Sequence, residues 1–484
     1  MKYVSLLIGG QKVQAIAGAS FERRNPIDGK VVTRCAAASA ADADRAVESA
    51  AAAFERWSLT TPGERRSLLS KAAAILGGRR EELVATVASE TGASSQWASF
   101  DAASAIAMLQ EAAAITTQVS GEVIPSDVPD RLSMALRQPA GVVLGIAPWN
   151  AAIVLAVRSI AVPLACGNTA ILKGSEVCPA THSLVADVFA EAGFPAGVVN
   201  YLSTAPSDAA AVVERLIAHP RVRRVNFTGS TRVGRIIGRL CGEHLKPAVL
   251  ELGGKAPLLV LADADLEAAA QAAIFGAFTN SGQICMSTER IIVDASVADS
   301  FVSLLADKAR ALPYGDPRHG PVTLGSVVDM ATVDRCNALL KDALDHGARL
   351  VCGGVADTTL MQATIVDRVT PNMRIYHEES FGPVKSVVRV TGDEEALACA
   401  NDTEFGLSAA VFSRDSARAF GIACRIQSGI CHINAPTVHD EPQMPFGGVK
   451  ASGIGRFGGR AGVAEFTDLR WVSMRVPVPS IAPQ

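Results

Sequence analysis

Residues 141–174 read GVVLGIAPWNAAIVLAVRSIAVPLACGNTAILKG, and they contain one complete strand–helix–strand unit. A continuous apolar run predicts a strand at Val142–Ile146, a helical pattern follows from Ala151, and a second apolar strand is predicted at Thr169–Lys173. Strands that are apolar at every position and separated by a helix are typical of a parallel sheet covered on both faces.

The same alternation continues to residue 251. Strands are predicted at 198–201, 224–227 and 248–250, and helices at about 180–192, at about 207–218 and from Val233 onward. Open sheets of this kind bind ligands beyond the carboxyl ends of their strands. The sequence therefore predicts an α/β domain whose site lies along that edge.

The flanking regions predict the rest of the architecture. Residues 41–120 carry amphipathic helical patterns, for which Ser39 and Thr61 are suitable N-terminal caps. A second α/β block spans about 252–450, with helices predicted at 265–279, 297–311 and 332–347. Two strand-like segments, 120–139 and 471–477, lie outside both blocks, and isolated strands need partners. We expect them to form a small third sheet or a contact between subunits.

The composition limits the classes of function. The 484 residues suffice for two or three domains, and the net charge of −3 gives no reason to expect nucleic acid or an anionic membrane as a partner. The ten cysteines form no C-x-x-C pair and show no zinc-like spacing with histidine, so no metal site is expected. No apolar run is long enough for a membrane span or a secretory signal. We expect a soluble, cytoplasmic protein that acts on a small molecule.

Three polar residues stand where chemistry could occur. Cys285 lies in the glycine-containing loop NSGQIC at 280–285, which suits a packed thiol and an exposed nucleophile equally. Glu251 ends an apolar strand ahead of two glycines; it is either a solvated carboxylate or a general base whose pKa is raised by apolar surroundings. Asn150 could cap the helix that follows it or donate its amide to an oxyanion.

A fourth segment has the features of a phosphate site. Residues 227–234 read FTGSTRVG and are predicted to run from a strand through a turn into a helix. Their glycines and hydroxyls could therefore approach a pyrophosphate at a helix N-terminus. The spacing differs from the common G-x-G-x-x-G pattern of dinucleotide-binding turns.

Taken in order over the whole chain, these segments resemble the aldehyde dehydrogenase superfamily. The resemblance is carried by PWN at 148–150, LKGSE at 172–176, FTGST at 227–231, LELGGK at 250–255, GQIC at 282–285, EESFGP at 378–383 and PFGGVKASG at 445–453. It implies the fold of that family: a parallel-sheet, Rossmann-like cofactor domain at 1–119 and 140–251, an α/β catalytic domain at 252–463, and a small β oligomerisation arm at 120–139 and 464–484. Self-association as a dimer or tetramer is also implied.

The same resemblance implies the residues of the site. Cys285 would be the nucleophile, Glu251 the base, and Asn150 with the Cys285 backbone N–H the oxyanion donors. The cofactor would be contacted by Ile146, Pro148, Trp149, Lys173, Glu176, Gly229, Ser230, Gly234, Leu252, Glu379 and Phe381. Of these, Lys173 and Glu176 would hold the adenosine ribose, and Glu379 and Phe381 would place the nicotinamide ribose. Because the Glu176 carboxylate would repel a 2′-phosphate, NAD is expected in preference to NADP.

The implied reaction is oxidation of an aldehyde to a carboxylic acid. It would proceed through a Cys285 thiohemiacetal and a thioester, which water activated by Glu251 would hydrolyse. Many relatives carry a glutamate after the S-G-x-G-R segment, proposed as a proton-relay partner, but this chain has Phe457 there. A relay through a second glutamate therefore cannot be carried over.

Three segments narrow the resemblance further. Residues 150–158, 285–290 and 432–441 look like those of the vanillin, benzaldehyde and salicylaldehyde dehydrogenase group, which oxidises ring aldehydes in bacterial aromatic degradation. Arg158, two helical turns after Asn150, could contact a ring hydroxyl or the product carboxylate, or form an ion pair at the domain boundary. Trp97 could form an aromatic wall for the ring or be a core residue.

Two alternatives to an aromatic aldehyde dehydrogenase stay open at this point. One is an aliphatic-aldehyde or semialdehyde dehydrogenase of the same superfamily. The other, from a different class, is a non-catalytic structural or binding relative of the fold, against which the joint presence of Cys285, Glu251 and Asn150 argues.

Overall fold

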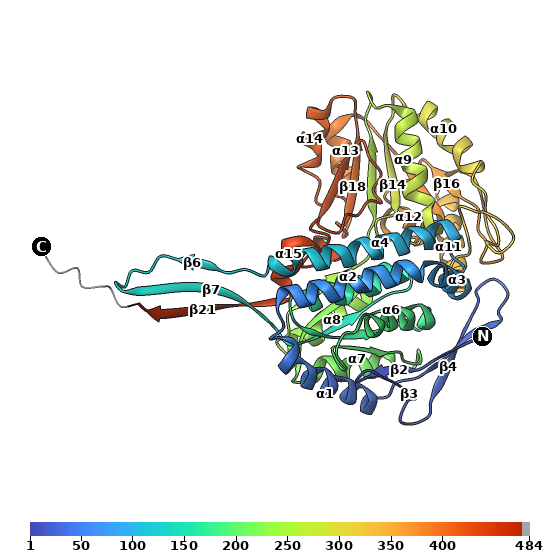
Figure 1. Ribbon diagram of the computed structural model, residues 1–484. Helices are drawn as coiled ribbons and strands as arrows, with labels where there is room; N and C mark the ends of the chain where they lie inside the picture. The colour runs from blue at the N-terminus through green and yellow to red at the C-terminus, as the bar shows by residue number, and fades with distance from the viewer. Residues whose placement is uncertain (477–484) are drawn as a thin grey trace, which may run out of the picture.

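The computed structural model describes residues 1–476, which form two stacked α/β units and a thin β arm that projects to one side (Figure 1). The first unit contains an eight-stranded sheet of order β20-β12-β11-β8-β9-β10-β2-β3. Its parallel centre consists of β8 (Val142–Ile146), β9 (Thr169–Lys173), β10 (Val199–Leu202), β11 (Val222–Thr228) and β12 (Ala248–Glu251). The predicted alternation of apolar strands and helices is confirmed here.

The edges of this sheet depart from the prediction of a parallel sheet, because they are antiparallel. β2 (Leu6–Ile8) and β3 (Gln11–Val13) form a hairpin on one edge. On the other edge, β20 (Gly453–Ile454) pairs with β12 and places Gly453 opposite Glu251. A side chain at Gly453 would approach the Leu250 carbonyl oxygen to 1.9 Å, so only glycine allows this pairing. A strand of two residues carries too little pattern to be predicted.

Helices cover both faces of the first sheet. They are α1 (Ala40–Trp57), α2 (Pro62–Gly78), α3 (Arg80–Thr91), α4 (Ser95–Ala114), α5 (Ala152–Ala165), α6 (Pro179–Ala192), α7 (Ala209–Ala218) and α8 (Thr231–Glu243). Ser39 and Thr61 both form capping boxes at the starts of α1 and α2, as predicted. Every residue of α5 is buried, because this helix is apolar on all sides and lies in the core.

The second unit contains a seven-stranded sheet of order β15-β16-β17-β14-β13-β18-β19. Its strands are β13 (Ala256–Val260), β14 (Thr288–Asp294), β15 (Arg349–Cys352), β16 (Thr364–Asp367), β17 (Val384–Val390), β18 (Ser408–Phe412) and β19 (Ile430–Ile433). Only β15, on one edge, is antiparallel to its neighbour. The helices are α9 (Leu266–Phe278), α10 (Ala298–Arg310), α11 (Met330–Asp345), α12 (Arg374–His377), α13 (Gly392–Asn401) and α14 (Ser416–Ala423), whereas the later helix α15 (Gly459–Glu465) packs against α5 of the first unit. The first three coincide with the predicted helices.

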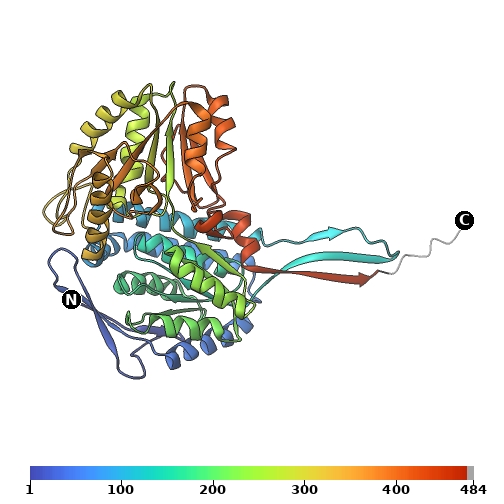
Figure 2. The same cartoon turned by 180° about the vertical axis from the view of Figure 1, so that it is seen from behind.

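The two isolated segments form the arm, which Figure 2 shows from behind. β21 (Thr467–Arg475) pairs antiparallel with β7 (Arg131–Pro139) along its whole length, and β6 (Glu122–Ile124) pairs with the other side of β7. The predicted third sheet is thus present, while residues 477–484 of the predicted arm lie outside the described residues. A further small sheet, which the sequence did not indicate, joins β1 (Lys2–Val4), β5 (Val31–Ala36) and β4 (Ser20–Arg24). Within residues 1–476, no helix is both long and apolar enough to cross a membrane.

Candidate active site

Asn150 follows β8 and is fixed from several directions. The Asn150 side-chain amide donates to the Gln283 carbonyl at 3.0 Å, and the Asn150 carbonyl accepts hydrogen bonds from Trp97 Nε1 at 3.0 Å and Asn280 Nδ2 at 2.9 Å. Its side chain does not cap α5, because the first N–H groups of that helix donate to the carboxylate of Asp101 on α4 instead. The amide is therefore turned toward the loop that carries Cys285.

Cys285 lies in a tightly folded loop between α9 and β14. Asn280, Ser281 and Gly282 all have positive φ (51°, 54° and 73°), a conformation that non-glycine residues rarely adopt. Hydrogen bonds compensate: the Ser281 hydroxyl donates to the Gly325 carbonyl at 3.0 Å, and Val328 N donates to Gln283 Oε1 at 2.9 Å. Such a strained, over-determined loop suits a functional position. Seven of the ten cysteines are buried, whereas Cys285 is only half-buried.

Glu251 ends β12 and faces the thiol of Cys285. Its carboxylate is 1 % exposed, and neither carboxylate oxygen has a hydrogen-bond partner among the described residues. Burial raises the pKa of Glu251 from 4.5 to about 7, an effect that the neighbouring thiol partly offsets. Burial and the nearby Glu251 carboxylate together raise the pKa of Cys285 well above its ordinary value. An unpaired buried carboxyl beside a thiol is the arrangement that a general base requires.

A cavity of about 420 Å³ joins these three residues to most of the predicted cofactor residues. It is lined by Pro148, Trp149, Asn150, Thr228, Gly229, Ser230, Glu251, Gly253, Cys285, Val328, Asp329, Ala331, Thr332, Arg335, Glu379 and Phe381. The stretch from Val328 to Arg335 is new compared with the sequence reasoning. The hydrogen bond from Val328 N to the Gln283 side chain brings this stretch to the cavity. The two residues are far apart in the sequence, so no local pattern predicts their contact.

The walls of this cavity fit a dinucleotide. The helix α8 begins at Thr231 with Ser230 as its cap, so its free N–H groups and positive dipole end point toward the space beside Gly229. A Cβ on Gly229 would approach the Phe227 ring to 2.4 Å, and one on Gly253 would approach Glu379 Oε2 to 2.8 Å. The backbone at Gly229 and Gly253 therefore carries no side chain and is accessible to a flat or anionic group in the cavity.

Glu379 and Phe381 close the other side of the cavity. Glu379 Oε1 accepts a hydrogen bond from Gly254 N at 3.0 Å, and burial raises the pKa of the Glu379 carboxyl to about 7. The Phe381 ring meets the Trp149 ring edge-on, with ring centres 5.8 Å apart. Two aromatic rings and a carboxylate thus surround the space in front of Cys285.

Five predicted cofactor residues do not line the cavity. Ile146 and Leu252 are buried in the core of the first unit, and a Cβ on Gly234 would approach Leu252 Cδ2 to 2.3 Å. Lys173 and Glu176 lie at the end of β9, where Lys173 Nζ and Glu176 Oε2 form an ion pair of 3.3 Å. The half-exposed Glu176 carboxylate is accessible to a ligand, while the Lys173 side chain is nearly buried.

The two predicted substrate residues also lie outside this cavity. The buried Arg158 forms an ion pair with Asp440 and stacks on Phe446, with 4.3 Å between Arg158 Cζ and the ring centre. Its positive charge lowers the pKa of both Glu251 and Cys285, so it lies within electrostatic reach of them. Phe457, which occupies the place of the relay glutamate, is buried beside the same guanidinium at 5.8 Å.

Trp97 lines a second cavity, of about 310 Å³, on the other side of Asn150. Phe100, Ile274 and Phe275 contribute apolar walls, and Asn280 belongs to both this wall and the hydrogen-bonding set of Asn150. The indole ring stacks on Phe100 with 5.5 Å between ring centres. Trp97 is thus a buried residue that also lines a cavity next to Asn150, the candidate oxyanion donor.

Comparison with known proteins agrees with this geometry. The family model described as "Aldehyde dehydrogenase family" matches residues 13–472. A vanillin dehydrogenase of Pseudomonas fluorescens is 60 % identical over 472 residues, 98 % of each chain, and a benzaldehyde dehydrogenase [NAD(+)] of Pseudomonas putida is 38 % identical over 93 % of this chain and 92 % of its own. The crystal structure of a salicylaldehyde dehydrogenase from Pseudomonas putida G7 complexed with salicylaldehyde superposes with a TM-score of 0.97 at 46 % identity, covering 100 % of both chains. The chain belongs to the aldehyde dehydrogenase family, whose members act with a nicotinamide cofactor.

Proposed function

We propose that this chain oxidises an aromatic aldehyde of the vanillin, salicylaldehyde or benzaldehyde type to the carboxylic acid, with NAD as the hydride acceptor. The observation that carries the proposal is the meeting of Cys285, Glu251 and Asn150 in one cavity with Trp149 and Phe381. The aromatic substrate class is supported by the identity of 60 % to a vanillin dehydrogenase and 46 % to a salicylaldehyde dehydrogenase.

The first half of the reaction forms a bond between Cys285 and the substrate. Glu251 has no hydrogen-bond partner within residues 1–476 and faces the thiol, so it takes the thiol proton, and the thiolate attacks the aldehyde carbon. The oxygen of the resulting thiohemiacetal becomes an oxyanion. An asparagine amide has two hydrogens, and that of Asn150 uses one on the Gln283 carbonyl, so the other is free for the oxyanion together with the Cys285 N–H.

The second half releases the acid. The bound nicotinamide supplies the acceptor for the hydride that leaves the thiohemiacetal carbon. The thioester that remains on Cys285 is attacked by water, from which Glu251 removes a proton. The C–S bond then breaks, the acid leaves and the thiol is restored. The balance is one aldehyde, one NAD⁺ and one water converted to one carboxylic acid, one NADH and one proton.

The cofactor residues divide by position in the proposed complex. Gly229 and Ser230, at the start of α8, would receive the pyrophosphate, and Glu379 would accept hydrogen bonds from the nicotinamide ribose. Pro148, Trp149 and Phe381 would bound the nicotinamide ring. Glu176 would accept hydrogen bonds from the adenosine ribose beside Lys173, which would favour NAD because its carboxylate repels a 2′-phosphate. Ile146, Gly234 and Leu252 shape this region from within the core.

The aromatic ring is proposed to contact Trp97 and Arg158, which line two separate cavities. The Trp97 N–H bond to the Asn150 carbonyl ties the indole directly to the segment that supplies the oxyanion donor. Arg158 supplies a polar end for ring substituents, and Asp440, which sequence reasoning missed, orients its guanidinium. An indole ring and a charged group are both suited to contacts with a hydroxylated aromatic ring.

The arm is proposed to mediate self-association as a dimer or tetramer. Val123, Leu469 and Trp471 on its strands are exposed by 69 %, 62 % and 78 %, an apolar surface that a second copy would cover. The division into cofactor domain, catalytic domain and arm at residues 1–119 and 140–251, 252–463, and 120–139 and 464–484 is part of the same proposal, as is a cytoplasmic location.

The proposal is tested with a panel of vanillin, salicylaldehyde, benzaldehyde and short aliphatic aldehydes, in which NADH is followed by absorbance. The aromatic aldehydes should give the highest kcat/KM, and Cys285→Ser should abolish turnover. Cys424→Ser, which changes an exposed cysteine, is the matched control and should turn over normally. Full activity of Cys285→Ser would refute the mechanism, and a preference for aliphatic aldehydes would refute the substrate class.

A further inference from the structure

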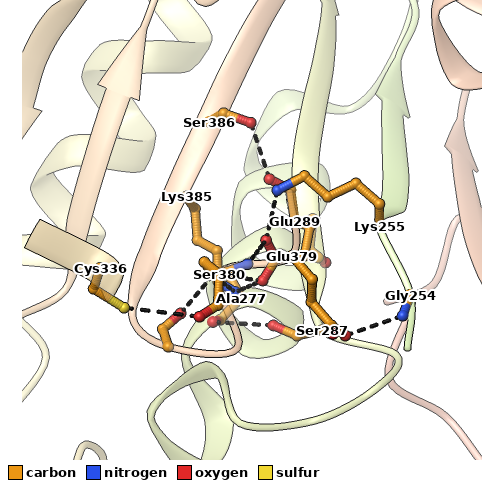
Figure 3. Close-up of polar contacts among 12 residues, drawn as sticks. Gly254, Lys255, Ala277, Ser287, Glu289, Cys336, Glu379, Ser380, Lys385 and Ser386 are labelled. Carbon is orange, nitrogen blue, oxygen red and sulfur yellow. Dashed lines mark hydrogen bonds and ion pairs between the residues drawn. The ribbon is translucent and has the colours of Figure 1, made fainter. Parts of the chain in front are cut away.

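A buried cluster of three charged side chains lies next to Glu379 and Ser380 (Figure 3). Glu289 on β14 forms ion pairs with Lys255 at 2.8 Å and with Lys385 on β17 at 2.6 Å. All three side chains are at most 2 % exposed. The proposed chemistry uses none of them.

The cluster is bonded to the loop that runs from Glu378 to Phe381. Both carboxylate oxygens of Glu289 are used: Ser380 N donates to Oε2 at 2.9 Å, and the Ser380 hydroxyl donates to Oε1 at 2.6 Å. Lys255 Nζ donates in addition to the Glu378 carbonyl at 2.6 Å. Glu378 and Ser380, the residues on either side of Glu379, are thus both hydrogen-bonded to the cluster.

The loop has a conformation that needs such support. Phe381 has φ 42°, in the left-handed region that disfavours residues with a side chain. Glu379 itself accepts a hydrogen bond from Gly254 N, the residue next to Lys255 (Figure 3). A shift of the cluster would therefore move Glu379, Phe381 and the Gly254 backbone together.

Stability does not explain why the cluster is charged. Removing three ions from water is expensive, and well-packed apolar residues often serve a core as well or better. Burial opposes the ionisation of Glu289, yet the two ammonium groups lower the pKa of its carboxyl to about 2, so it remains a full acceptor. Charged hydrogen bonds are strong and directional, so they fix the position of the Ser380 backbone.

We infer that Glu289, with Lys255 and Lys385, is a positioning residue for the cofactor: it holds the loop Glu378–Phe381 so that Glu379 and Phe381 meet the nicotinamide riboside. This inference rests on the proposed function of Glu379 and Phe381. It assigns no contact between Glu289 and the cofactor or substrate. Its effect passes through Ser380 and the Glu378 carbonyl.

The test uses the paired variant Glu289→Gln with Lys385→Met, which removes one charge of each sign and so leaves the net charge of the cluster unchanged. Two readouts do not depend on turnover: hydrogen–deuterium exchange of peptides covering 374–388, and NAD affinity by calorimetry. Loss of the charged hydrogen bonds to Ser380 should raise the amide exchange rate of these peptides by about tenfold or more. It should raise the Kd for NAD by about the same factor. Ser380→Ala should produce a smaller change in the same direction. Glu267→Gln, in an exposed ion pair with Lys308, is the control.

The outcomes separate this inference from the proposed function. Reaction of Cys285 with iodoacetamide in the absence of NAD should be unchanged in the paired variant, because the thiol loop is held by other bonds. Wild-type exchange and NAD affinity in the paired variant, combined with weakened NAD binding in Glu379→Gln, would overturn the inference alone. Wild-type NAD affinity in Glu379→Gln would remove the proposed role of that residue, and the inference with it.

Discussion

Replacing Glu251 by glutamine should stabilise the free protein at alkaline pH while stopping the hydrolytic half of the reaction. The carboxylate is buried and has no hydrogen-bond partner in the described part of the chain, so the ionised form is disfavoured in the folded state. Glutamine has nearly the same shape and carries no charge at any pH. The variant therefore removes the ionisation and leaves the packing in place.

The size of the effect follows from the pKa of Glu251. Folding raises this pKa from 4.5 to about 7. The folded state therefore binds the proton more tightly, and the resulting stability is present below pH 4.5 and lost as the pH rises through about 7. At about 1.4 kcal/mol per pKa unit, the loss amounts to roughly 3 kcal/mol. Most of it falls between about pH 5 and 8.

Urea unfolding followed by tryptophan fluorescence at several pH values measures this difference. The free energy of unfolding of Glu251→Gln minus that of wild type should rise by roughly 3 kcal/mol from acid to alkaline pH. Glu243→Gln, at the exposed end of α8, should show no such trend. In rapid mixing, Glu251→Gln should release about one NADH per site and then stall, and this release should be slower than in wild type because glutamine cannot take the thiol proton of Cys285. A difference independent of pH, or normal steady-state turnover, would refute the assignment of Glu251 as a buried base.

Three further variants test the proposed site. Asn150→Ala should lower kcat by roughly 100- to 1,000-fold through loss of one oxyanion donor, with NAD affinity unchanged by calorimetry; a loss below tenfold would place the oxyanion elsewhere. Trp97→Ala should raise KM for benzaldehyde more than KM for a short aliphatic aldehyde, and equal changes would remove the indole from the ring pocket. Glu176→Gln should improve kcat/KM with NADP relative to NAD, since a repulsive carboxylate is lost; an unchanged ratio would show that another group selects the cofactor.

Much of the fold follows from local pattern. The apolar strands β8 to β12, the intervening helices and the capping boxes at Ser39 and Thr61 all depend on residues within about one turn or strand of each other. Features formed by residues that are far apart in the sequence could not be predicted from a local pattern. The strand Gly453–Ile454 is specified by its neighbour β12, and the partner of Arg158 lies 282 residues away at Asp440.

The candidate site divides in the same way. Cys285, Glu251 and Asn150 could be singled out because each stands in a loop or at a strand end, but each also had a structural explanation, and their predicted roles came from the resemblance to the aldehyde dehydrogenase superfamily. The wall from Val328 to Arg335 and the support of the loop by Glu289 were not found. Within its strand Glu289 stands between the polar residues Thr288 and Arg290, so the sequence does not single it out, and only the arrangement of β14, β17 and Lys255 shows that it is paired.

The charges around Cys285 determine how the thiol can react. Burial raises the pKa of both the thiol and the Glu251 carboxyl, and each anion disfavours the other. Arg158 favours both anions, but Asp440, its ion-pair partner, raises the pKa of Glu251 and so offsets part of this effect. The site therefore tolerates one negative charge more readily than two. Transfer of the thiol proton to an ionised Glu251 keeps the number of negative charges at one. The nucleophile can therefore form without a further charge entering the buried site. Glu251 must then lose this proton before it can act as the base for water.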